Sequence, residues 1–168
     1  SAGNYLNTRN NLIEITSRDI VLDGEIHAGL GDIMFTTCLR NSMGIGGTGP
    51  GHEGTFNVYR AELGNMICDD LKFESPAGKI DVHHTVSLDT ARIAGAITIN
   101  ASSEEGRIVF NDDAQFKELF AFAGNGTLIK EDVILETTVG DLMLEGDHES
   151  ESIVHKHIDI ERRVSLHA

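Results

Sequence analysis

The chain has 168 residues, of which 40% are hydrophobic, and a formal net charge of −14 at pH 7. This length suits one domain with a core of its own, and the acidity disfavours nucleic acid and anionic lipid as partners because like charges repel. No apolar run approaches the roughly 20 residues that a membrane-spanning helix needs, so membrane insertion is not expected.

Two stretches of the chain repeat one another. Residues 19–22 (DIVL) match residues 132–135 (DVIL), and residues 31–35 (GDIMF) match residues 140–144 (GDLML). In both copies the apolar runs are short and stop at Gly, Asp or Asn, which is typical of strands. The repetition indicates a fold built from similar units.

Between the two copies, short runs alternate apolar with polar residues. Such alternation places one face of a strand in a core and the other face in water. In chain order, these predicted strands are residues 56–58, 71–73, 80–82, 86–88, 97–99, 108–110 and 158–160. Helical patches are expected only at residues 59–66 and 113–122.

The connections between the strands point to an all-β architecture with parallel pairing. Tight turns between alternating strands are few, with Asp23-Gly24 and Asn125-Gly126 as exceptions, whereas antiparallel sheets use many of them. We therefore expect a single parallel β-solenoid spanning residues 1–168. About seven coils at about 4.8 Å each would give a rod of roughly 30–35 Å. A β-sandwich is the alternative fold.

Several motifs in a fixed order resemble one known family. The motifs are SMGIGGTG (42–49), AELGNMICDDLKF (61–73), GKIDV (78–82), GAITINA (95–101), GNGTL (124–128) and GDLMLEGD (140–147). Together they resemble the repeats of filamentous-haemagglutinin-like exoproteins, which are giant secreted surface proteins. The resemblance implies a right-handed parallel β-helix (β-solenoid), an extracellular or cell-surface location, and a role as a fibre or adhesin without enzymatic activity.

A solenoid ends in unpaired strand edges that have to be capped or joined. Joining head to tail gives an open filament, so the expected partners are other copies of the chain. The strand-like terminal segments, residues 1–16 and 152–168, are the expected joints. The alternative is an adhesin segment that binds carbohydrate or a cell surface through exposed loops. The candidates in its longest loop are Gly44, Gly46, Gly47, His52 and Glu53.

Two acidic pairs lie at predicted turns, and calcium is the ligand that they would suit. Asp69-Asp70 and Asp112-Asp113 offer the carboxylate oxygens that hard cations prefer,. Neighbouring residues on a strand point to opposite faces, so neither pair is a ready-made acid and base. No nucleophile motif is present. We expect no enzyme and no cofactor other than calcium.

Cysteines, sequons and histidines complete the set of candidate sites. Cys38 and Cys68 are either a disulfide between neighbouring coils or two small buried thiols,. Asn100 and Asn125 begin N-glycosylation sequons, which matter only in a secreted eukaryotic chain. The two histidine clusters are expected to be solvated or to lie at interfaces, because no third metal ligand accompanies them. These clusters are His83-His84 and His155-Lys156-His157.

Overall fold

The computed structural model describes residues 4–38, 41–48, 55–76, 78–146, 158–161 and 163–168. Within these residues the fold is all-β except for α1 (Arg60–Leu63), which confirms part of the helical patch predicted at 59–66. The second predicted helix, at 113–122, is wrong. That segment forms β12 (Ala114–Phe116) and β13 (Leu119–Ala123), whose buried and half-buried residues alternate along the chain.

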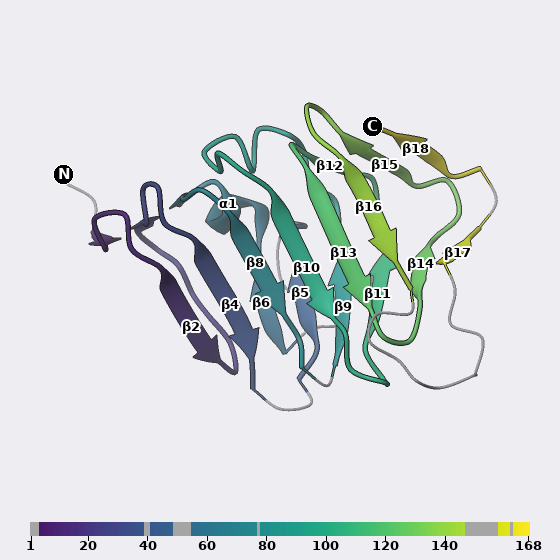
Figure 1. Ribbon diagram of the computed structural model, residues 1–168, viewed down its shortest axis with the longest axis horizontal. Helices are drawn as coiled ribbons and strands as arrows, with labels where there is room; N and C mark the ends of the chain where they lie inside the picture. The colour runs from purple at the N-terminus through teal and green to yellow at the C-terminus, as the bar shows by residue number, and fades with distance from the viewer. Residues whose placement is uncertain (1–3, 39–40, 49–54, 77, 147–157, 162) are drawn as a thin grey trace.

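Six strands form sheet 1, which runs along the whole described molecule. Neighbouring strands follow one another in chain order, and Figure 1 shows them side by side along the longest axis. The strands are β2 (Ile13–Ser17), β4 (Ile33–Thr37), β8 (Leu71–Glu74), β10 (Ile97–Ala101), β13 and β16 (Leu142–Glu145).

Sheet 2 lies behind sheet 1 in Figure 1 and also has six strands. Its strands, in spatial order, are β6 (Phe56–Val58), β5 (Met43–Ile45), β9 (Lys79–Val82), β11 (Arg107–Phe110), β14 (Thr127–Ile129) and β17 (Ile158–Ile160). Only β6 breaks the chain order, because it lies outside β5 at the N-terminal end. β6 therefore takes the position beside β5 that residues 18–24 leave without a strand.

Two shorter sheets complete the fold. Sheet 3 contains β1 (Tyr5–Asn7), β3 (Glu25–His27) and β7 (Met66–Ile67), and sheet 4 contains β12, β15 (Ile134–Thr137) and β18 (Ser165–His167). Every strand pair in the four sheets is parallel. The antiparallel pairs of a β-sandwich therefore do not occur among the described strands.

The core consists of rows in which each inward-facing residue lies on its counterpart in the next strand. One row of sheet 1 is Ile13, Ile33, Leu71, Ile97, Leu119 and Leu142, and the other is Ile15, Phe35, Phe73, Ile99, Ala121 and Leu144. The rings of Phe35 and Phe73 stack with centroids 5.8 Å apart. No strand hides its apolar face alone, because each row is covered by the neighbouring strands and by the facing sheet. The ring of Phe35, for example, also lies 5.9 Å from that of Phe56 in sheet 2.

The internal repeat identified in the sequence has a structural basis in one half only. Residues 31–35 and 140–144 both enter sheet 1, and Ile33 and Leu142 occupy the same inward row. This half confirms equivalent units. Residues 132–135 lead into β15 of sheet 4, whereas residues 19–22 form no strand. The second half is wrong as a structural equivalence.

Candidate functional site

The N-terminal end of sheet 1 exposes a strand edge. Ile13 donates its N–H to the carbonyl oxygen of Asp32, the residue just before β4 (2.9 Å). Cys38 donates its N–H to the carbonyl oxygen of Ser17 (3.0 Å). In a parallel sheet, the backbone N–H and C=O groups of one residue both bond to the same neighbouring strand, and those of the next residue point to the opposite side. The backbone N–H and C=O groups of Glu14 and Thr16 therefore point away from β4, toward a side where no described strand lies.

At the C-terminal end of sheet 1, the outer edge of β16 is also exposed. Leu119 donates its N–H to Asp141 O (3.0 Å), so the residues of β16 that face β13 with their N–H groups are Met143 and Glu145,. The backbone groups of Leu142 and Leu144 point away from β13. Among the described strands, β16 has no further neighbour in sheet 1.

In sheet 2, the N-terminal edge is closed by side chains. Asp19 Oδ1 accepts a hydrogen bond from the backbone N–H of Asn57 at the centre of β6 (3.2 Å). Glu62, only 8% exposed, accepts one from Leu22 N–H (2.8 Å) and one from Tyr59 N–H (2.8 Å). These bonds hold residues 18–24 beside β6 and occupy its outward N–H, which is a common way to protect an edge strand.

Residues 18–24 form one wall of an apolar hollow, which we call the N-terminal socket. Its volume is about 290 Å³. It opens at the end of the core, where Ile15, Ile20 and Leu22 are only partly buried. Its lining residues are Asn4, Tyr5, Leu6, Ile15, Ile20, Leu22, Gly24, Glu25 and Ile26.

At the C-terminal end, three large apolar side chains continue inward-facing rows but remain exposed. Ile158 is 38% exposed, Ile160 is 52% exposed and Leu166 is 43% exposed. Ile160 pairs with the fully buried Ile129, and Leu166 pairs with the fully buried Leu135. The exposure arises because no described strand follows them in their sheets.

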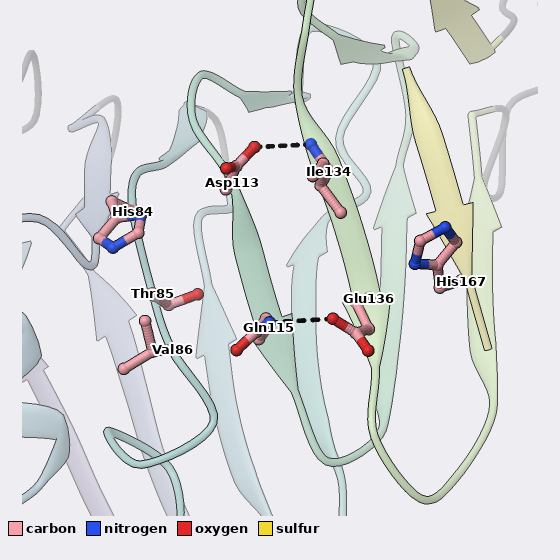
Figure 2. A pocket seen from close by; sticks show the side chains of 8 residues that line it. All are labelled: His84, Thr85, Val86, Asp113, Gln115, Ile134, Glu136 and His167. Atoms are coloured by element: carbon pink, nitrogen blue, oxygen red, sulfur yellow. Dashed lines mark hydrogen bonds between the residues drawn. The ribbon is translucent and has the colours of Figure 1, made fainter. Parts of the chain in front are cut away.

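The outer face of sheet 4 carries a second hollow, of about 230 Å³, shown in Figure 2. Asp113 Oδ1 accepts a hydrogen bond from Ile134 N–H (2.7 Å), and Gln115 Nε2 donates to Glu136 (2.9 Å). His84 and His167 lie on opposite sides of it. Both carboxylates are held by neighbours on adjacent strands, so they serve the sheet itself.

Next to this hollow is a more open, acidic one of about 280 Å³ that shares His84 and Asp113. Of the four proposed calcium ligands, only Asp112 and Asp113 lie here, while Asp70 Oδ1 accepts from Ala96 N–H (2.9 Å) elsewhere. Asp112 Oδ2 lies 3.3 Å from His83 Nδ1. No described residues form a group of three His, Cys, Asp or Glu side chains suited to a metal ion.

The predicted binding loop differs from the expectation. Gly44, Gly46 and Gly47 are buried, and Gly44 lies inside β5. Gly46 has a φ of +86°, and a Cβ there would lie 2.7 Å from the carbonyl oxygen of His83. These glycines permit close packing, so their prediction as an exposed surface is wrong. His52 and Glu53 lie outside the described residues.

The sequons and the histidine clusters are separated along the fold. Asn100 is half-buried on the outward side of β10, and Asn125 is exposed between β13 and β14. Their glycosylation stays a prediction. Of the histidine clusters, His83-His84 borders the acidic hollow, and His155 and His157 lie outside the described residues.

The two cysteines are free thiols, so the disulfide alternative is wrong. Cys38 is exposed after the end of β4, and Cys68 is buried before the start of β8. Because Ile33 pairs with Leu71, Cys38 lies five residues after this pair and Cys68 lies three residues before it, so roughly 16 Å or more separates the two positions,. A disulfide needs Cα atoms within about 7 Å.

Burial raises the pKa of the Cys68 thiol from 9.0 to about 12, and the nearby carboxylates of Asp32 and Asp70 act in the same direction. The unfolded chain releases this proton more readily. The contribution of the Cys68 thiol to the free energy of unfolding is therefore complete below pH 9 and is lost as the pH rises toward 12. In urea titrations between these pH values, Cys68→Ala should flatten the alkaline loss of unfolding free energy. An unchanged slope would contradict burial of the thiol.

Comparison with known proteins gives no relative from which a function can be transferred. The chain matches no family model, no curated protein and no solved structure. The resemblance to filamentous-haemagglutinin-like repeats therefore stays a prediction. Within the described residues, no helix has the length and apolar character needed to cross a membrane.

Proposed function

We propose that this chain is a right-handed parallel β-helix and a structural module of an extracellular fibre, in which copies join head to tail. The uniformly parallel pairing and the chain order of sheet 1 support the β-helix. Counting one coil for each described strand of sheet 1, the proposed β-helix has six coils. At about 4.8 Å per coil, one copy adds about 29 Å to the fibre.

The observation that carries the proposal is the match between the free edges of β16 and β2. If Ile13 of one copy lies on Leu142 of the preceding copy, both inward rows of sheet 1 continue without interruption. The outward N–H and C=O groups of β16 and β2 then face each other in the same alternation as those of neighbouring strands inside the sheet,. The new bonds are Leu142 N–H to Leu12 O, Glu14 N–H to Leu142 O, Leu144 N–H to Glu14 O, and Thr16 N–H to Leu144 O.

This edge match also fixes the direction of assembly. Two N-terminal ends cannot reproduce the parallel ladder, because the strands that meet would run antiparallel or place their inward faces outward. A head-to-tail contact uses two different surfaces, so it leaves a free surface at each end of every oligomer. Such a contact gives an open filament unless its rotation closes a ring.

The proposed extracellular location rests on the sequence resemblance, and the proposed lack of catalysis rests on the resemblance and on the described surface. The carboxylates of the sheet 4 hollow are engaged in bonds between strands. The net charge of −14 keeps finished filaments laterally apart by mutual repulsion,. Antibody labelling of intact source cells tests the location, and labelling only after permeabilisation would contradict it.

Electron microscopy of the purified chain over a range of concentrations tests the assembly. We expect unbranched filaments above a threshold concentration, with an axial repeat of about 29 Å for six coils. Sedimentation should show a pelleted fraction that grows above the same threshold. Compact monomers at every concentration would overturn the proposed function.

A further inference from the structure

We infer that the N-terminal socket receives the exposed apolar side chains of β17 and β18 from the preceding copy. This inference rests on the proposed head-to-tail assembly and identifies the contact that makes it stable. It assigns the two ends different means of joining: sheet 1 continues through backbone hydrogen bonds, and the remainder of the joint is formed by side chains.

The closed edge of β6 prevents the joint from using backbone hydrogen bonds in sheet 2 as it does in sheet 1. Asp19 already accepts from the N–H of Asn57, and Glu62 holds Leu22 beside it. A strand from another copy cannot pair with β6 unless these bonds break. Opposite sheet 2, the joint must therefore be made by the partly buried side chains of Ile20 and Leu22.

At the C-terminal end, the exposed side chains lie where they would meet the socket of the next copy. Ile160 lies in the inward row formed by Val58, Ile45, Val82, Phe110 and Ile129. In a head-to-tail stack, this row leads to the side of the next copy where residues 18–24 cover β6. Ile160 and Leu166 then face the socket instead of water.

The backbone hydrogen bonds of sheet 1 are too few to hold two copies together without further contacts. The four backbone hydrogen bonds of the sheet 1 ladder each contribute only modestly, because they replace hydrogen bonds to water. Association costs translational and rotational freedom, and this cost is comparable to or larger than the gain from so few bonds. Burying large apolar side chains adds a favourable contribution that grows with the apolar area removed from water. The apolar contacts at both ends are thus needed for a lasting filament, and a second copy is the partner that also continues the sheet.

The chain contains no tryptophan, so a single introduced tryptophan reports on this contact. Ile160→Trp, added as a minor fraction to the unmodified chain, should shift its fluorescence to shorter wavelengths as filaments form. Leu88→Trp is the matched control, because Leu88 is 79% exposed in the connection between β9 and β10 and far from both ends. Its emission should stay unchanged.

A second pair of variants measures how much the contact contributes. Ile160→Asp places a charge against the socket and should raise the threshold concentration at least about tenfold. Leu88→Asp should change it less than about twofold. If filaments form but Ile160→Trp keeps the emission of an exposed residue, or if both Asp variants assemble alike, the socket inference is overturned while the filament stands. If the unmodified chain forms no filaments, the proposed function itself fails.

Discussion

Thr16→Pro is expected to abolish filament elongation while leaving the monomer folded. The N–H of Thr16 points away from β4, so proline removes no hydrogen bond inside the chain,. Proline is tolerated on edge strands for this reason, and it blocks the edge to a further strand. In the proposed joint, it deletes the bond to Leu144 O and places a ring against β16 of the preceding copy.

Thr16→Ala is the matched control, because it removes the same side chain but keeps the N–H. We expect Thr16→Ala to assemble at a threshold within about twofold of the unmodified chain. Circular dichroism establishes that both variants are folded, and sedimentation with microscopy measures assembly. Filaments of a folded Thr16→Pro chain would show that the edge of β2 is not part of the joint.

Phe73→Ala should destabilise the folded chain by about 3–5 kcal/mol. Phe73 is fully buried in the middle of sheet 1, and its ring stacks on that of Phe35. Its removal leaves a cavity that interrupts an inward row of the core. For a chain of this size, the melting temperature should fall by roughly 10 °C.

Phe120→Ala provides the comparison for that core substitution. Phe120 lies on β13 of the same sheet, but it faces outward between Thr98 and Met143 and is only half-buried. The same change there should cost about 1 kcal/mol. Equal losses of unfolding free energy for the two variants would contradict the assignment of the inward and outward faces of sheet 1.

Much of the fold could be predicted from the sequence because its strands are written in a two-residue period. Residues 71–73, 80–82 and 97–99 all lie in strands, and their apolar residues alternate with polar ones. The strand predicted at 86–88 from the same alternation is wrong, because these residues lie in a turn between β9 and β10. The repeat of 31–35 at 140–144 identified two members of one sheet, because identical positions in a stack have to meet the same row of neighbours. The scarcity of hairpin turn signals correctly predicted parallel pairing.

Errors arose where a short segment is decided by distant contacts. Residues 113–122 have an apolar spacing compatible with a helix, yet β12 and β13 form because β15 and β10 provide edges to pair with. The position of β6 outside β5 has no signal in its own sequence, since it depends on residues 18–24 forming no strand in sheet 2. The glycines at 44, 46 and 47 look like a loop but are buried against residues 81–85.

The candidate site was predicted only in part. Both terminal segments were identified from their strand-like patterns, and β2, β17 and β18 lie there. Sequence reasoning missed the closure of β6, because Glu62 and Leu22 are 40 residues apart and a carboxylate between Ala61 and Leu63 carries no sign of its partner. It also missed the socket, since a hollow formed by Leu6, Ile15 and Leu22 exists only after three separate segments meet.

The most direct measurement of the head-to-tail joint is disulfide trapping across β16 and β2. In the proposed register, Glu14 of one copy lies opposite Met143 of the preceding copy, with Cα atoms about 4.8 Å apart. Glu14→Cys with Met143→Cys, in a Cys38→Ser chain, should give a ladder of disulfide-linked multimers on oxidation. Glu14→Cys with Glu145→Cys places the Cα atoms about 8 Å apart and should give few. Equal trapping by both pairs, or none by the first in filaments, would contradict the joint.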